Sequence, residues 1–166
     1  MVELVLWDLD ETLLSSHHLR DARHQSTPCE LRQLDVFPGT ALHEGVAQVM
    51  TKTEDVRMGI VTSSPLWYVE QILDHFMPKV SFDVMVTYED VPEIKPDPRP
   101  LELALRRAGV KPWQSIYIGD SIVDYEACAS AKVRFLGAGW ADEPTFPRGA
   151  EILRHPLDLW AILEAA

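Results

Sequence analysis

Short and almost wholly apolar runs recur along this chain of 166 residues, and they alternate with segments of helical period. A strand that is apolar on both faces is typical of a parallel sheet covered by helices on both sides. The alternation therefore predicts an α/β fold, with a three-layer, Rossmann-like and mostly parallel sheet between two layers of helices. The runs expected to form strands are Val2–Trp7, Met58–Val61, Val84–Val86, Ile116–Ile118 and Val133–Leu136.

The segments between these runs repeat apolar residues every three or four positions, as amphipathic helices do. At this length the elements fit one domain, spanning residues 1–166. In such a sheet, ligands bind beyond the carboxyl ends of the strands. The expected helices are Thr40–Lys52, Pro65–Phe76, Pro100–Ala108, Asp124–Ala131 and Pro156–Glu164, with Ala150–Leu153 as an edge strand.

One polar segment, residues 15–36, does not fit the alternation. Its helical pattern is weak and is interrupted at Pro28. We expect a short insertion after the first strand, made of one or two helices that stand over the strand ends. Four basic residues of this segment are candidates for substrate contact, although such side chains more often form an exposed polar face. They are His17, His18, Arg20 and Arg23.

The charge balance argues against several partners. Lys and Arg number 15 against 26 Asp and Glu, a formal net charge of −11. This excess disfavours nucleic acid, and a phosphorylated ligand would need a bound cation. No run approaches the roughly 20 apolar residues of a membrane helix, so we expect a cytoplasmic protein with no membrane partner. Cys29 and Cys128 lie far apart in the sequence, which favours two buried thiols over a disulfide or zinc site.

Two pairs of carboxylates follow predicted strands. Asp8 and Asp10 end the first run, and Asp120 and Asp124 follow the fourth. Because parallel strands end at one edge of the sheet, the pairs are expected to converge. Like charges so close together require a cation or a shared proton, and oxygen ligands suit Mg²⁺. The alternative for either pair alone is a turn or a helix cap.

Hydroxyl and amino groups follow two further strands. Thr62 and Ser63 end the second run just before Pro65, which is expected to begin a helix. Hydroxyls and free N–H groups at a helix start suit an anionic oxygen. Alternatively, Ser63 or Ser64 would serve equally well as an N-cap. Lys95 lies in a proline-rich loop after the third run, although most lysines are exposed without a special role. Together with the carboxylates, these groups describe in-line phosphoryl transfer, with Thr62, Ser63 and Lys95 binding phosphate.

This set of residues resembles the haloacid dehalogenase superfamily of phosphohydrolases. Its four motifs occur in the family's order, and the resemblance covers nearly the whole chain. The matching residues are Asp8-Leu9-Asp10-Glu11-Thr12, Thr62 at the end of Gly59-Ile60-Val61-Thr62, Lys95-Pro96, and Gly119-Asp120 followed by Asp124.

The resemblance implies a role for each matching residue. Asp8 would be the nucleophile that forms an aspartyl-phosphate, and Asp10 would protonate the leaving oxygen and then activate water. Thr62 and Lys95 would hold the transferred phosphoryl group. The implied ligands of Mg²⁺ are the carboxylates of Asp8 and Asp120, the backbone carbonyl of Asp10, and Asp124 directly or through water.

The family's larger caps are missing, because residues 15–36 make up only a small, cap-like insertion. The implied function is a Mg²⁺-dependent phosphatase, a phosphoric monoester hydrolase whose site is nearly open. An open site suits a macromolecular phosphate, or a second subunit that covers it in a homo-oligomer, and a small-molecule substrate stays possible. Two alternatives are a phosphotransferase or mutase of the same superfamily and a regulatory binding module without catalysis.

Overall fold

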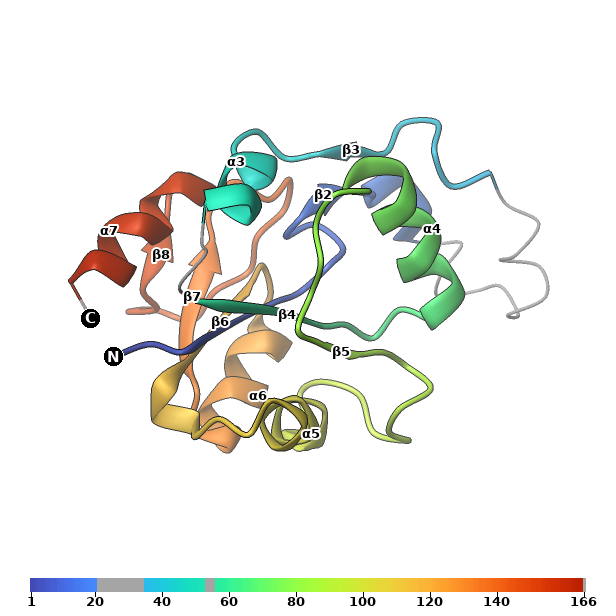
Figure 1. Ribbon diagram of the computed structural model, residues 1–166. Coiled ribbons are helices and arrows are strands. Elements are labelled where there is room, and N and C mark those ends of the chain that lie inside the picture. Colours follow the sequence, from blue (N-terminus) through green and yellow to red (C-terminus); the bar gives the residue numbers. More distant parts are fainter. Residues whose placement is uncertain (21–34, 53–55, 166) are drawn as a thin grey trace.

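The computed structural model describes residues 1–20, 35–52 and 56–165. Its centre is a six-stranded sheet in which all neighbouring strands run parallel, in the order β5-β4-β1-β6-β7-β8 (Figure 1). The strands are β1 (Leu4–Trp7), β4 (Arg57–Val61), β5 (Val84–Val86), β6 (Ser115–Gly119), β7 (Arg134–Ala138) and β8 (Ile152–Leu153). β2 (Leu14–Ser15) and β3 (Ala41–Leu42) form a separate antiparallel pair.

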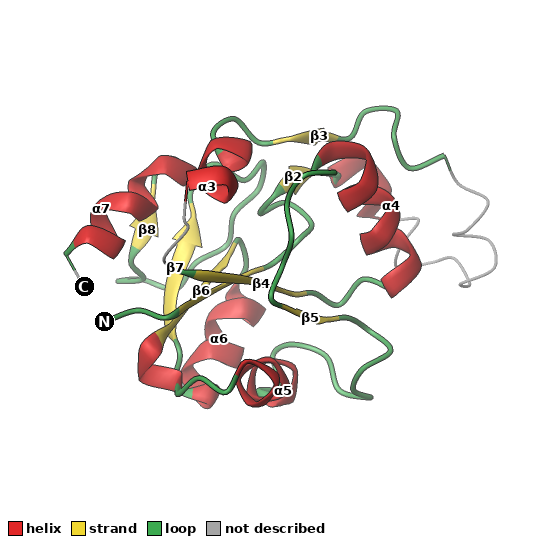
Figure 2. Ribbon diagram, in the orientation of Figure 1, coloured by secondary structure: helices red, strands yellow, loops and turns green. Residues whose placement is uncertain are grey.

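Helices cover both faces of the large sheet (Figure 2). One face carries α5 (Arg99–Ala108) and α6 (Ile122–Ala131), and the other carries α3 (Val46–Lys52), α4 (Leu66–Phe76) and α7 (Leu159–Glu164). The described residues also form short 3₁₀ helices, which are η1 (His17–Leu19), η2 (Pro112–Gln114) and η3 (Pro156–Asp158). The predicted three-layer, mostly parallel α/β fold is confirmed.

The central strand β1 is apolar throughout because both of its faces are buried in the core. Leu4 and Leu6 pack into the core on the α5–α6 side, whereas Val5 and Trp7 pack into the core on the opposite side. All four side chains are fully buried, because successive residues of a strand point to opposite faces of the sheet. β1 pairs with β4 on one side and β6 on the other, so the segment that follows it begins at the centre of the sheet edge.

The expected helix Thr40–Lys52 is wrong in its first half. Ala41 and Leu42 form β3, which pairs with β2, and the helix begins only at Val46. Gly45 separates the two with a φ of +88°, a backbone conformation that a helix cannot include. The pairing of β3 with β2 therefore determines the structure here, although the local spacing of apolar residues predicted a helix.

The other element ends differ by small shifts. α6 begins at Ile122 instead of Asp124, because Ser121 caps it and accepts a hydrogen bond from the Asp124 amide. α5 begins one residue earlier than expected, and the edge strand is only Ile152–Leu153. The closing segment is a 3₁₀ turn followed by α7.

The insertion predicted at residues 15–36 is described only at its two ends. Residues 15–20 contain the end of β2 and η1, while residues 21–34, which include Arg23 and Cys29, lie outside the described residues. Cys128 is buried and carries a free thiol, as expected. Within the described ranges, no helix is both long and apolar enough to cross a bilayer.

Candidate active site

Three of the predicted site residues directly follow three adjacent strands. Asp8 follows β1, Thr62 follows β4 and Asp120 follows β6, and all three are at least nine-tenths buried. The Asp8 amide donates to the Ile118 carbonyl (2.9 Å), which extends the parallel ladder by one residue and fixes the nucleophile candidate at the sheet edge. The sheet topology has therefore brought together residues more than 100 positions apart.

Lys95 lies at the centre of the site and is buried with the groups it binds. Its ammonium donates to Asp8 Oδ1 (2.7 Å), forms an ion pair with Asp124 Oδ1 (2.6 Å) and donates to the Tyr117 hydroxyl (2.6 Å). An ammonium has three N–H groups, so these partners satisfy all of them. Although burial alone would lower the pKa of Lys95, the neighbouring carboxylates Asp124 and Asp8 raise it above its ordinary value.

Tyr117 is a site residue that the sequence reasoning missed. Its hydroxyl lies within hydrogen-bonding distance of the Val61 carbonyl (3.0 Å) and of Asp124 Oδ1 (3.2 Å), besides accepting from Lys95. Burial, followed by the charges of Asp124 and Asp8, raises its pKa well above the ordinary value, so the hydroxyl keeps its proton. The available signal was a tyrosine inside an aliphatic strand, because a buried tyrosine hydroxyl usually has a polar partner.

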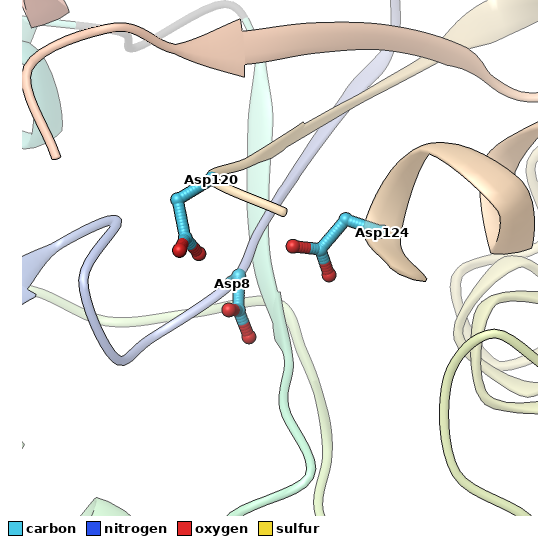
Figure 3. A group of neighbouring side chains, drawn as sticks. All are labelled: Asp8, Asp120 and Asp124. Carbon is cyan, nitrogen blue, oxygen red and sulfur yellow. The ribbon is translucent and has the colours of Figure 1, made fainter. Parts of the chain in front are cut away.

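The carboxylates of Asp8, Asp120 and Asp124 form an acidic group. Each offers one oxygen that lies within 4.8 Å of the others, and Figure 3 shows the three side chains pointing toward one another. Gly119 permits this approach, since a Cβ at that position would lie 2.7 Å from the Asp124 side chain. Thr12 also donates to Asp120 Oδ1 (3.3 Å).

The electrostatics of this group favour a bound cation. Burial, and then repulsion from Asp124, raise the pKa of Asp120 to about 6. Burial also raises the pKa of Asp8, although Lys95 opposes the shift. A divalent cation would stabilise the ionised forms, and a set of carboxylate oxygens matches the preference of Mg²⁺. The carboxylates of Asp8, Asp120 and Asp124 thus fit the predicted ion and could hold it.

The carboxylate of Asp10 is turned elsewhere and is not part of that group. Its Oδ1 accepts hydrogen bonds from the Ser16 and Tyr68 hydroxyls, both at 2.7 Å, and its Oδ2 accepts one from Ser64 (2.6 Å). These three hydroxyls were not predicted as partners of Asp10. The expected convergence of the two carboxylate pairs therefore holds for Asp8, Asp120 and Asp124 but not for the side chain of Asp10.

The predicted phosphate-binding hydroxyls differ in environment. Thr62 is buried and its Oγ1 accepts from the Ser64 amide (3.1 Å), whereas Ser63 is exposed. Neither Ser63 nor Ser64 is the N-cap of α4, because Pro65 occupies that position without a side-chain cap bond. Thr62, Ser63 and Lys95 all line one cavity of about 490 Å³, together with Asp8, Asp10 and Asp124.

The basic residues at the start of the insertion are engaged away from this cavity. Arg20 forms an ion pair with Glu143 (3.1 Å), and His17 Nδ1 lies 3.8 Å from the same carboxylate. The His18 ring lies against Gly39. None of these three side chains lines the cavity.

A cavity at the carboxyl ends of a parallel sheet is where α/β enzymes bind their ligands, and the oxygen-rich lining of this one suits a metal ion. The family model of the haloacid dehalogenase-like hydrolases matches residues 22–138, which is more than half of the chain. The chain belongs to this family. The sequence-based prediction of the family is thereby confirmed.

Curated relatives are phosphatases. The chain is 26% identical to the pyrophosphatase PpaX of Bacillus cereus, with 84% of each protein covered. It is 26% identical to the N-acetylmuramic acid 6-phosphate phosphatase of Pseudomonas putida, with 82% of this chain and 65% of that protein covered. It is 30% identical to the phosphoglycolate phosphatase of Pseudomonas putida, but spans only 42% of that protein's length. The prediction of an enzyme of the phosphatase class is confirmed by these relatives.

Solved structures share the fold. A haloacid dehalogenase superfamily hydrolase of Geobacter sulfurreducens superposes with a TM-score of 0.79 at 18% identity, over 98% of this chain and 96% of that chain. CbbY of Rhodobacter sphaeroides, in complex with phosphate, superposes with a TM-score of 0.76 at 20% identity, over 96% of both chains.

Proposed function

We propose that this chain is a Mg²⁺-dependent phosphatase that hydrolyses a phosphate monoester through an aspartyl-phosphate on Asp8. The observation that carries the proposal is the position of Asp8 in the cavity, where its carboxylate accepts a hydrogen bond from the ammonium of Lys95 and lies close to those of Asp120 and Asp124. Lys95 favours the ionised carboxylate, which is the form that attacks phosphorus. The hydroxyl of Thr62 would bind one equatorial oxygen of the phosphoryl group, and the same ammonium would exchange one of its present partners for another such oxygen.

Asp10 is the proposed general acid and base. It lines the same cavity as Asp8, and its hydroxyl partners can either donate or accept hydrogen bonds. They can therefore accommodate Asp10 as the acid that protonates the leaving oxygen and as the base that activates water. The exposed Ser63 on the cavity wall indicates that solvent reaches the site, which supports hydrolysis over transfer to a second substrate.

Asp8, Asp120 and Asp124 would hold the metal ion, with the backbone carbonyl of Asp10 as a further ligand. When bound, Mg²⁺ would neutralise charge on the phosphoryl oxygens. The acidic group without a cation would repel a dianionic ester, which explains why the proposed reaction depends on the ion.

We also propose that residues 1–166 form one catalytic domain, with residues 15–36 as its small cap-like insertion, in a cytoplasmic protein. The substrates in the relatives' names, which are pyrophosphate, phosphoglycolate and a sugar 6-phosphate, are candidates, along with an exposed phosphate on a macromolecule.

The test is phosphate release from an aryl phosphate with and without Mg²⁺, together with the fate of labelled phosphorus. Wild-type protein should release phosphate only with Mg²⁺, and protein quenched in acid during turnover of an ester with labelled phosphorus should carry the label on Asp8. Asp8→Asn should lose activity by about 10⁴-fold. The matched control is Asp74→Asn, which alters an exposed carboxylate on α4 and should be fully active. Steady release of phosphate at saturating substrate, with no label on the quenched protein, would contradict the covalent intermediate.

A further inference from the structure

Among the described residues, four exposed side chains line the cavity, and three of them are large and apolar. These three, Tyr88, Ile94 and Val123, have exposed fractions of 55%, 49% and 37% and form what we call the apolar mouth, while the fourth is Ser63. Only eight large hydrophobic side chains are exposed on the described part of the chain, and these are three of them. Two more, Leu66 and Ile122, are chain neighbours of residues that line the same cavity. Exposed apolar side chains that gather around one cavity mark a binding surface, whereas scattered ones do not.

The backbone that presents these side chains is held in place. The Tyr88 amide donates to the Ser64 carbonyl (3.1 Å), and the Thr87 amide donates to Asp90 Oδ2 (2.7 Å). The Ile94 carbonyl accepts from the Asp97 amide (2.9 Å). The apolar mouth is therefore formed before a ligand arrives, which reduces the entropy lost on binding.

The direction of the proposed reaction places the leaving group of the ester against this apolar mouth. In an in-line displacement the leaving group departs opposite the nucleophile. Asp8 is only 8% exposed, whereas Tyr88, Ile94 and Val123 on the same cavity are much more exposed. We therefore expect the leaving group to depart from buried Asp8 toward these three exposed side chains.

The charges of the cavity restrict what that leaving group can be. Among the described residues that line it, Lys95 is the single cation, and its ammonium is already bound to Asp8 and Asp124. A second carboxylate or phosphate on the leaving group would meet the apolar mouth and the carboxylate of Asp10. Transfer of a charge to apolar surroundings without a partner is unfavourable, so the mouth favours a neutral group.

We propose that the site selects monoesters whose leaving group is uncharged and carries a planar apolar ring, and that Tyr88, Ile94 and Val123 determine this specificity. The proposal rests on the proposed phosphatase function and deepens it by naming the substrate class. It distinguishes this chain from enzymes whose leaving groups are anions, such as phosphate or glycolate. Tyr88 contributes the ring face on which such a group would stack.

The experiment compares kcat/KM, in the presence of Mg²⁺, for three esters of primary alcohols: benzyl phosphate, methyl phosphate and phosphoglycolate. These differ in the ring and the charge near the ester bond. We expect benzyl phosphate to exceed methyl phosphate by about tenfold, and phosphoglycolate to be the poorest substrate. Phosphoglycolate as the best of the three would overturn the proposal.

Variants of Tyr88 separate a specific contact from a structural effect. Tyr88→Ala should reduce the ratio of benzyl to methyl phosphate by about fivefold, while Tyr88→Phe should keep it. Tyr88→Arg should raise the relative kcat/KM of phosphoglycolate, because it places a cation at the mouth. The control is Trp113→Ala, whose side chain is 78% exposed and lies outside the cavity, and which should leave all ratios unchanged.

The outcomes also separate this proposal from the proposed function. An equal loss on all three esters in Tyr88→Ala, with an unchanged ratio, would overturn the specificity role of the ring. Absence of Mg²⁺-dependent release from every ester, or full activity in Asp8→Asn, would overturn the phosphatase proposal itself, and the specificity proposal with it.

Discussion

Asp8 and Asp10 stand two residues apart, yet they have different neighbours. Asp8 is bound by the ammonium of Lys95 beside two further carboxylates, whereas Asp10 accepts hydrogen bonds from three hydroxyls. An ammonium only donates, and so favours the anion. A hydroxyl donates or accepts, and so can serve either protonation state. The comparison teaches that the environment can give two identical side chains different chemical roles.

The largest effect expected from testing this comparison comes from removing the carboxylate of Asp10, which the three hydroxyls bind. Asp10→Asn should reduce turnover of an alkyl phosphate by about 10³-fold, because general acid and base catalysis is lost. An activated aryl ester needs little protonation of its leaving group, so its first step should continue while hydrolysis of the intermediate is slow. Rapid-mixing measurements should then show a burst of phenol and phosphorylated protein. An equal loss on both esters, without a burst, would contradict the role of Asp10.

The next largest effect comes from removing the ammonium of Lys95, which pairs with Asp8. Lys95→Met should lower the free energy of unfolding, measured in chelator at neutral pH, by about 3 kcal/mol, since it leaves buried carboxylates without their cation. The pKa of Lys95 is raised above its ordinary value of 10.5, so its stabilising contribution is fully present below that pH and is lost only at higher pH.

Mg²⁺ sharpens that test. Adding the ion should restore more stability in Lys95→Met than in the wild type, because the variant site is more negative. Lys95→Arg keeps the positive charge and serves as the control in denaturant titrations. An unfolding free energy that is unchanged in Lys95→Met would show that Asp8 and Asp124 do not depend on the ammonium.

The contrast between the surroundings of Asp8 and Asp10 also explains how much of the site could be predicted from sequence. Asp8, Thr62 and Asp120 each follow an apolar run, and parallel strands bring their ends to one edge. Their convergence therefore followed from the alternation of strands and helices alone. Lys95 follows the same rule from a longer loop, and its match to a family motif was needed to select it among the lysines.

The partners of Asp10 could not be predicted in this way. Tyr68 lies within the first turn of α4, and its hydroxyl reaches Asp10 only because that helix packs over β1. Ser16 reaches the same carboxylate because the pairing of β2 with β3 positions the segment after β1. Both contacts depend on packing between distant elements, which also replaced the expected start of the helix at Thr40 with a strand.

The smallest predicted effect tests whether the hydroxyl partners position Asp10. Tyr68→Phe removes one hydrogen bond to a carboxylate, worth about 1.5 kcal/mol, and should lower kcat for an alkyl phosphate about tenfold. The loss should disappear in an Asp10→Asn background, because the Tyr68 hydroxyl then has no catalytic carboxylate to orient.

Tyr117→Phe supplies the matched comparison, since its hydroxyl contacts Lys95 and Asp124 instead. It should alter the Mg²⁺ concentration needed for half-maximal activity, whereas Tyr68→Phe should not. If the losses caused by Tyr68→Phe and Asp10→Asn simply add, the tyrosine acts on the fold and not through Asp10. A shift in Mg²⁺ requirement in Tyr68→Phe alone would show that the two aspartates share one network, and the division of roles between them would then be wrong.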